Sequence, residues 1–261
     1  MSYLEDMFSL KGRIAIVTGG ARGNGKAIAA GLLKANASVI ICDIIKEELD
    51  KTVSEFEREY GTTTVCGYRC DLTNDKDFDC FKSYIKNNYM GLGRVDILVN
   101  NAGITRGNHF LDYTKEDWDA TLKINLEVPC KLSQFVGGIM KEHGGGSIIN
   151  ITSLNSEQGF AGNPAYVASK GALKQLSKAM AMDLGKYGVR VNNVGPGYFQ
   201  TDMTKKSWKN RKKEISDRTI LGRWGDPKDL EGIVVFLSSD SSSYITGQDI
   251  YVDGGWLAKG V

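Results

Sequence analysis

Tyr166 and Lys170 have the residue types and the spacing needed to move a proton. They stand four positions apart in a stretch of helical periodicity, so one helical turn places both side chains on the same face. A free tyrosine has a pKa of about 10 and is a weak base near neutral pH. A neighbouring ammonium group stabilises the phenolate, and lowering the pKa to about 7 takes roughly 4 kcal/mol. The pair therefore predicts a general base and acid that acts on a hydroxyl group.

Two other polar residues belong to the same hypothesis. Ser153 follows the apolar run 147–151, and its hydroxyl can hold a substrate oxygen. Asn125 is a polar residue inside an apolar helical segment. Each feature also has an ordinary explanation, because Tyr and Lys reach this spacing by chance, Ser153 can be a loop hydroxyl and Asn125 a hydrogen-bonded core amide. Only the ordered set of residues predicts catalysis.

A glycine-rich turn, residues 18–26, follows the first apolar run. Glycines permit a tight turn, let backbone N–H groups approach a pyrophosphate and let the next helix pack closely. That helix directs the positive end of its dipole at the anion. Glycine-rich turns are common, but this one lies between a strand pattern and a helix pattern, which predicts a dinucleotide site. The cofactor-binding residues expected here are Gly19, Arg22, Gly23, Asn24 and Gly25.

Asp43 closes the second apolar run, 20 residues after Gly23. A carboxylate at this point accepts hydrogen bonds from the ribose hydroxyls of a dinucleotide and repels a 2′-phosphate, which favours NAD over NADP. Arg22 and Lys46 are nearby cations that argue for NADP instead. The alternative explanation of Asp43 is a loop carboxylate that caps the following helix. We expect NAD as the cofactor, with NADP as the alternative.

These residues need a scaffold, and short apolar runs alternating with amphipathic segments supply it. Near-continuous apolar runs are typical of parallel strands that are covered on both faces. Helical spacing is clear in segments 26–35, 46–60 and 168–187. The pattern predicts a single α/β domain with a doubly wound parallel sheet of about seven strands and helices on both faces. The seven runs are 14–17, 39–42, 63–66, 95–99, 147–151, 189–194 and 248–252.

Composition and charge limit the function classes. The 261 residues include 33 Lys and Arg against 31 Asp and Glu, a net charge of +2 that gives no general attraction to nucleic acid or membranes. The first residues are acidic and unlike a signal peptide, so we expect a cytoplasmic protein. The two histidines and the cysteine spacing indicate no zinc site, and we expect buried, reduced thiols. The cysteines are Cys42, Cys66, Cys70, Cys80 and Cys130.

Over essentially its whole length the sequence resembles the short-chain dehydrogenase/reductase family, whose fold is a Rossmann domain. The glycine turn matches the family's cofactor motif, and Asn125, Ser153, Tyr166 and Lys170 match its catalytic tetrad in order and context. The resemblance implies a proton relay through Asn125, a Lys170 contact to the nicotinamide ribose and a homotetramer. Asn24 departs from the family, where this position is usually apolar. Further cofactor contacts implied are Asp71, Leu72, Asn101, Ala102, Gly103, Pro196, Gly197 and Thr201.

The substrate is expected to contact residues 198–218, a segment that typically closes over the active site in the family. This segment is strongly basic, which indicates either a solvated helix face or attraction of an anionic substrate. Arg106 is a further candidate for pairing a carboxylate, although it can equally be a surface residue. We expect the substrate to contact Arg106, Ser153 and Tyr166. The basic residues are Lys205, Lys206, Lys209, Arg211, Lys212 and Lys213.

Three functions remain open at this point. Segments 221–227 and 252–258 resemble gluconate 5-dehydrogenases and 2-deoxygluconate or 2-keto-3-deoxygluconate dehydrogenases, which favours hydride transfer between NAD and a sugar acid or polyol. Segments 103–106 and 244–248 are shared with 3-oxoacyl-carrier-protein reductases, which usually use NADP. A non-catalytic cofactor sensor on the same fold is the third alternative, but such proteins usually lack the tyrosine or the lysine, and both are present here.

Overall fold

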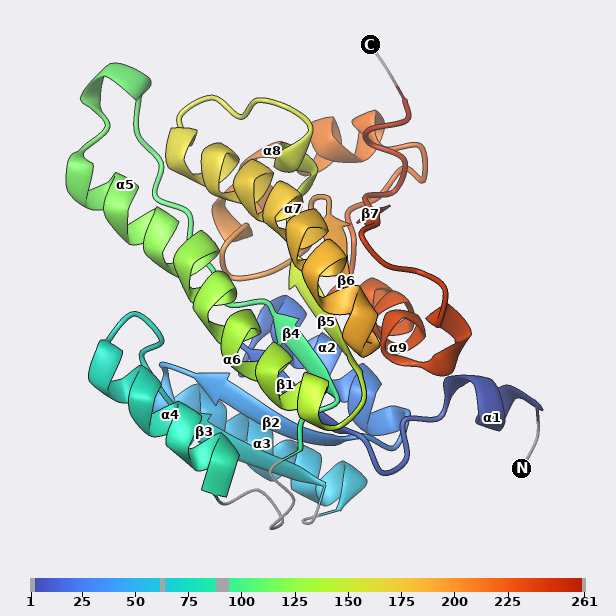
Figure 1. Cartoon of the computed structure of the whole chain (residues 1–261). Helices are drawn as coiled ribbons and strands as arrows, with labels where there is room; N and C mark the ends of the chain where they lie inside the picture. The colour runs from blue at the N-terminus through green and yellow to red at the C-terminus, as the bar shows by residue number, and fades with distance from the viewer. Residues whose placement is uncertain (1–2, 62–63, 88–93, 260–261) are drawn as a thin grey trace.

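The computed structural model describes residues 3–61, 64–87 and 94–259. Seven strands form one parallel sheet in the order β3-β2-β1-β4-β5-β6-β7 (Figure 1). The chain winds outward from β1 to β3, crosses back, and then winds outward on the other side from β4 to β7. The strands are β1 Ile14–Thr18, β2 Ser38–Asp43, β3 Val65–Arg69, β4 Ile97–Asn100, β5 Gly146–Ile151, β6 Val189–Pro196 and β7 Asp249–Val252.

Helices cover both faces of the sheet (Figure 1). The α-helices are α1 Tyr3–Phe8, α2 Gly23–Lys34, α3 Lys46–Tyr60, α4 Asp75–Asn87, α5 Lys115–Leu122, α6 Val128–Glu142, α7 Pro164–Leu184, α8 Lys205–Arg218 and α9 Glu231–Ser238. A π-helical turn, η2 Lys123–Glu127, joins α5 to α6. The 3₁₀ turns are η1 Phe110–Asp112, η3 Leu154–Ser156, η4 Gly185–Tyr187, η5 Pro227–Leu230 and η6 Asp240–Ser242.

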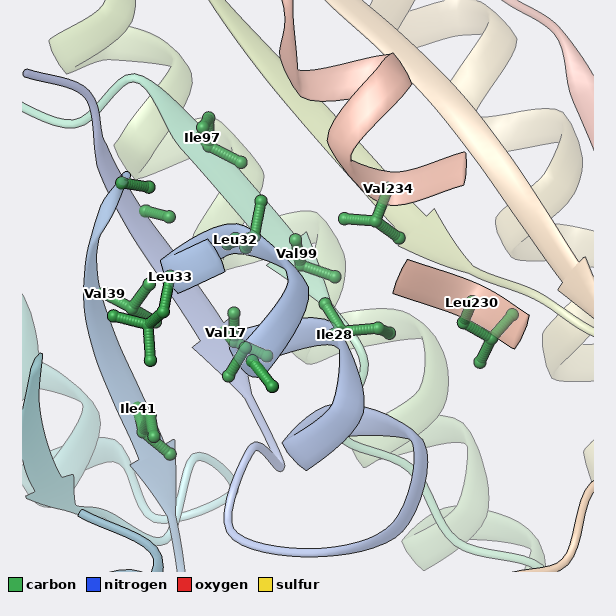
Figure 2. Close-up of a cluster of buried hydrophobic side chains, with 14 of the residues drawn as sticks. Val17, Ile28, Leu32, Leu33, Val39, Ile41, Ile97, Val99, Leu230 and Val234 are labelled. Carbon is green, nitrogen blue, oxygen red and sulfur yellow. The ribbon is translucent and has the colours of Figure 1, made fainter. Parts of the chain in front are cut away.

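Alternate residues of each central strand supply two apolar clusters. In β1, Ala15 and Val17 pack with α2, α3 and α9, whereas Ile14 and Ile16 pack with α4, α6 and α7. Figure 2 shows the first cluster, in which Ile28 of α2 lies among strand residues. Burying one such side chain contributes about 1.5–3 kcal/mol. The sheet is therefore held from both faces, which fixes the positions of the loops at its ends.

The expected single doubly wound sheet of seven strands is confirmed. The third strand is displaced from the expected run 63–66 to Val65–Arg69, and Thr63 lies outside the described residues. β3 is an edge strand whose burial alternates, so it lacks the continuous apolar signal of a central strand. The long helix α7 begins at Pro164 instead of residue 168, because proline is accommodated in the first turn of a helix.

The cysteines are all free thiols, but the expectation that all are buried is wrong. Cys42 and Cys70 are buried, Cys66 and Cys130 are half-buried, and Cys80 is exposed on α4. Cys80 lies on the outer face of an amphipathic helix, where the core does not require an apolar residue. In the described ranges, we find no helix with the length and apolar character to span a bilayer.

The glycine turn leads to a test of the fold. A Cβ atom on Gly25 would lie 2.0 Å from the carbonyl oxygen of Gly19, whereas a Cβ atom on Gly138, in α6, would meet nothing within 4 Å. We expect Gly25→Ala to lower the free energy of unfolding by about 1–3 kcal/mol, because the turn must open. The matched control Gly138→Ala should raise it by up to about 1 kcal/mol. Urea unfolding measures both, and equal effects would contradict the packing described here.

Candidate active site

A cavity of about 810 Å³ opens at the carboxyl ends of the strands. It reaches from the ends of β2 and β3 to the ends of β5 and β6, across the point between β1 and β4 where the strand order reverses. Parallel sheets of this kind bind ligands at that reversal point. The structure brings the expected residues together around this cavity: Gly19, Arg22, Gly23, Asn24, Gly25, Asp43, Asp71, Leu72, Asn101, Ala102, Gly103, Arg106, Ser153, Tyr166, Lys170, Pro196, Gly197 and Thr201.

The glycine turn forms the central wall of the cavity. Gly19 and Gly23 adopt left-handed φ angles of 61° and 53°, which L side chains rarely tolerate. The Asn101 side chain donates hydrogen bonds to the carbonyls of Thr18 and Gly19, both at 2.9 Å, and so holds the turn against the end of β4. The N-cap Arg22 makes no side-chain cap on α2. The N–H groups of the first turn are thus available to an anion, as a dinucleotide pyrophosphate requires.

Asp43 is buried at the end of β2 and holds two main-chain groups. Its carboxylate accepts hydrogen bonds from the N–H groups of Ala21 and Ile45, each at 3.1 Å. Ile45 is the N-cap of α3, so the capping explanation of Asp43 also applies. The two roles are compatible, because the same bonds fix the negative charge at the edge of the cavity.

The two cations that argued for NADP are engaged with carboxylates. Arg22 lies 3.4 Å from Asp202, and Lys46 lies 2.7 Å from Asp50. All four side chains are more than half exposed, so each pair contributes little stability. The pairs nevertheless reduce the positive charge next to Asp43.

Asp71 shapes the adjoining loop after β3. Its Oδ1 accepts hydrogen bonds from the N–H and the hydroxyl of Thr73, at 2.9 and 2.7 Å, and this turn presents Leu72 to the cavity. The N–H group of Asp71 donates to Asp77 at 3.2 Å, in the first turn of α4. These bonds set the wall of the cavity opposite the glycine turn.

Lys170 and Tyr166 lie on one face of α7, as the spacing predicted. The Lys170 Nζ lies 5.9 Å from the centre of the Tyr166 ring and donates a 2.6 Å hydrogen bond to the carbonyl of Ile151. Burial lowers the pKa of Lys170 to about 8. Burial also raises the pKa of Tyr166, and a hydrogen bond with Ser153 partly opposes this rise.

The lowered pKa that the hypothesis assigns to Tyr166 needs the positive charges of Lys170 and of an oxidised nicotinamide ring together, and it stays a prediction; Lys170 alone does not produce it here. The physical reason is that desolvation on the inner face of α7, where Lys170 is buried and Tyr166 half-buried, disfavours the charged form of each group. Ser153 is positioned for its own role, because its Oγ accepts a 3.1 Å hydrogen bond from the N–H of Asn155 and remains able to donate its proton.

Asn125 is fully buried beneath the cavity wall, and it does not line the cavity. Its amide exchanges two hydrogen bonds with the main chain of Ile104, at 2.9 and 3.0 Å, and donates a third to Ser169 of α7 at 3.1 Å. The π-helical turn η2 directs the amide to this position. Asn125 therefore ties the loop after β4 to α7, and its predicted role in proton relay stays a prediction.

A chain of buried polar side chains behind the site was missed by the sequence analysis. Asn100 donates to Asn150 at 2.7 Å, Asn150 donates to Ser177 at 2.8 Å, and Ser177 donates to Asn193 at 2.6 Å. These bonds link β4, β5 and β6 to α7, on which Tyr166 lies. The available signal was an asparagine inside each of three apolar strands, and the three asparagines lie in register across the sheet.

The remaining substrate candidates are Arg106 and the basic segment 198–218. Arg106 lines the cavity but pairs with Asp117 at 2.9 Å, with about half of its side chain exposed. Residues 199 and 201–204 also line the cavity, ahead of α8. The basic side chains of α8 do not line it, and Arg211 and Lys213 pair with carboxylates of the same helix. This arrangement agrees with a solvated helix face.

Known proteins resemble this chain over nearly its full length. A family model described as enoyl-(acyl carrier protein) reductase matches residues 19–257. The gluconate 5-dehydrogenase of Gluconobacter oxydans is 39% identical and the 3-oxoacyl-[acyl-carrier-protein] reductase of Thermotoga maritima 38% identical. The alignments cover 96% of this chain and 96% of the first relative, and 94% of this chain and 98% of the second.

A solved structure is also similar to this chain over nearly its full length. The gluconate 5-dehydrogenase from Burkholderia cenocepacia, in complex with NADP and tartrate, is 33% identical and superposes with a TM-score of 0.91. The alignment covers 98% of this chain and 99% of that one. Together with the cavity and its residues, these similarities establish that the chain belongs to the short-chain dehydrogenase/reductase family.

Proposed function

We propose that this oxidoreductase transfers a hydride between NAD and the secondary alcohol or ketone of a sugar acid or polyol, as a gluconate 5-dehydrogenase-like enzyme. The observation that carries the proposal is the single cavity that joins Asp43 and the glycine turn to Ser153, Tyr166 and Lys170. Such a cavity allows a dinucleotide to extend from a ribose-binding carboxylate to a proton-transfer group. The names of the relatives support the substrate class.

Ser153, Tyr166 and Lys170 each have a separate role in the proposed proton transfer. The bound dinucleotide supplies the hydride acceptor in oxidation and the hydride donor in reduction. Ser153 donates a hydrogen bond to the reacting oxygen of the substrate, while the Asn155 N–H holds the Ser153 Oγ. The Tyr166 oxygen takes the hydroxyl proton in oxidation and returns it in reduction. Lys170 supplies positive charge from the same face of α7 and binds the nicotinamide ribose.

The cofactor preference follows from charge at one edge of the cavity. The Asp43 carboxylate is buried and fixed by two N–H groups, and Arg22 and Lys46 are paired with other carboxylates. A 2′-phosphate placed there meets the negative charge of Asp43, and Arg22 and Lys46 would have to leave Asp202 and Asp50 in order to pair with it. We therefore infer NAD in preference to NADP. The NADP held by the Burkholderia cenocepacia enzyme belongs to that protein and gives no support to this choice.

An anionic or polyhydroxylated substrate fits the open end of the cavity. Arg106 lines that end, and its guanidinium can exchange Asp117 for a substrate carboxylate in a bidentate pair. Residues 198–218 would cover the bound substrate, with residues 201–204 closest to it. The tartrate in the Burkholderia cenocepacia structure, a hydroxylated dicarboxylate, is consistent with this class of substrate.

The second candidate is a 3-oxoacyl-carrier-protein reductase that uses NADP. It is supported by the match to the Thermotoga maritima reductase and by the exposed basic face of α8, which could dock an acidic carrier. The buried Asp43 argues against its usual cofactor.

We also propose that the protein is a homotetramer in the cytoplasm. Large apolar side chains are exposed on the described surface, with Phe110, Leu111, Met182 and Tyr244 each more than two thirds exposed. Exposed apolar side chains of this kind mark a contact surface between subunits where they lie together in one patch. The five free cysteines are consistent with a reducing compartment.

A substrate panel tests the activity directly. We expect NADH formation with gluconate and the reverse reaction with 5-ketogluconate, and little turnover of acetoacetyl thioesters. Tyr166→Phe should lower kcat by about 10²–10⁴-fold with unchanged NADH binding, because only the proton transfer is lost. NADPH-linked reduction of acetoacetyl thioesters, without activity on any sugar acid, would establish the second candidate instead.

The cofactor preference can be reversed at Asp43. We expect Asp43→Asn to tighten NADP binding about tenfold or more, because the fixed charge is removed while the amide oxygen can still accept one N–H bond. Fluorescence titration with NADH and NADPH measures the preference. Asp79→Asn, which removes an exposed carboxylate on α4 that does not line the cavity, is the control and should leave it unchanged. An unchanged ratio of affinities in Asp43→Asn would refute the inference.

Burial of Lys170 predicts a pH dependence of stability. Its pKa is about 8 in the folded chain and about 10.5 when unfolded, so the unfolded chain binds more protons between these values. Stability should therefore rise with pH across this window, by at most about 1.4 kcal/mol per pH unit from this group. We expect urea unfolding from pH 8 to pH 10 to show a smaller rise for Lys170→Met than for the wild type. Parallel curves would contradict the desolvation of Lys170.

A further inference from the structure

Asn24 carries an amide that lacks a partner in the dinucleotide site. It occupies the first turn of α2 and lines the cavity. Its Oδ1 atom is buried without a hydrogen-bond donor. An unsatisfied buried oxygen of this kind destabilises the folded chain. An apolar side chain of similar volume would have no unsatisfied oxygen. The amide of Asn24 therefore indicates a hydrogen-bonding group on the ligand that fills the site.

The position of Asn24 limits what this group can be. A Cβ atom on the preceding Gly23 would lie 3.4 Å from the Thr201 side chain, and Arg22 pairs with Asp202 at 3.4 Å. Both partners follow β6, the strand next to β5, and Ser153 lies just beyond β5. The turn therefore crosses the cavity. Ala21 reaches Asp43 at the end of β2, whereas Arg22 and Gly23, next to Asn24, meet the segment that follows β6.

The chemistry of an amide narrows the choice further. A side-chain amide offers one acceptor and two N–H donors, and a half-turn about its last torsion exchanges them. Phosphate oxygens are acceptors only and cannot satisfy Oδ1. A carboxamide both donates and accepts, and the nicotinamide ring carries one next to its reactive carbon.

We propose that the Asn24 side chain hydrogen-bonds the carboxamide of the nicotinamide ring and fixes the orientation of that ring over Tyr166. This inference rests on the proposed dinucleotide site. It assigns to Asn24 a specific contact to the reacting half of the cofactor, in place of a general role in the glycine turn.

Two ligands separate this contact from the others in the site. NADH carries the carboxamide, whereas ADP-ribose keeps the adenosine, the pyrophosphate and a ribose but lacks the nicotinamide. We expect Asn24→Leu to weaken NADH binding roughly 3- to 10-fold, the loss of one hydrogen bond, and to leave ADP-ribose binding within about twofold. Calorimetric titration measures both affinities. Asn210→Leu, at an exposed position of α8 that does not line the cavity, is the control.

A cofactor analogue isolates the bond itself. In reduced 3-acetylpyridine adenine dinucleotide, a methyl group replaces the carboxamide NH₂. The wild type should prefer NADH to this analogue, and Asn24→Leu should reduce that preference by the factor lost with NADH, since coupled groups give non-additive changes. Without nucleotide, the Tm of Asn24→Leu should equal or exceed that of the wild type, because the unsatisfied oxygen is removed.

Each outcome decides the proposal. Equal weakening of NADH and ADP-ribose would place the contact on the pyrophosphate or the ribose, and unchanged binding of both would leave Asn24 without a ligand; either result overturns the inference. A lower Tm with unchanged NADH preference would assign Asn24 a structural role and also overturn it. Should Asn24→Leu not fold, Asn24→Ser supplies the same comparisons. A wild type that binds neither NADH nor ADP-ribose would refute the proposed function itself.

Discussion

The close approach of the glycine turn to the end of β4 is the contact on which the site depends. β1 and β4 are neighbours in the sheet although more than 70 residues separate them, with Val17 paired to Val99. The Thr18 hydroxyl oxygen accepts hydrogen bonds from the N–H groups of Asn101 and Ala102, both at 3.0 Å, and the Asn101 amide returns two bonds to the turn. The loops on either side of the reversal point thus form one unit. A side chain at Gly25 would separate them, which explains why the turn needs glycine there.

The proposed catalytic groups are held in place by a different set of interactions. Tyr166 and Lys170 lie on α7, which is anchored through Ser177 to asparagines of β5 and β6 and through Ser169 to Asn125. Buried amides and hydroxyls with satisfied partners hold their elements in one arrangement, because any displacement leaves polar groups unpaired. Polar bonds as well as apolar packing therefore hold Tyr166 and Lys170, the proposed proton-transfer residues, in place relative to the sheet.

The sequence predicted the fold class and the glycine turn, because these depend on local patterns of apolar runs and helical spacing. The resemblance to the family, and not a local pattern, implied most of the other residues that meet in the cavity, such as Asp71, Asn101 and Thr201. The sequence did not predict the displaced edge strand β3, whose burial alternates, or the exposure of Cys80. It also missed the bonds of Asn100, Asn150 and Asn193, since pairing across strands depends on register, which a single strand does not reveal. The pKa values of Tyr166 and Lys170 were the least predictable property, because their spacing in the sequence does not reveal how strongly each side chain is desolvated.

This desolvation changes how the site must generate its base. Desolvation raises the pKa of Tyr166 and lowers that of Lys170, so packing disfavours the charged form of both groups. In the proposed mechanism the phenolate then depends on the positive charge of Lys170 and of an oxidised nicotinamide ring, while the Ser153 hydroxyl holds the substrate oxygen. Coupling between binding and ionisation is reciprocal, so a cationic ring that lowers the pKa of Tyr166 must itself bind more tightly to the phenolate form.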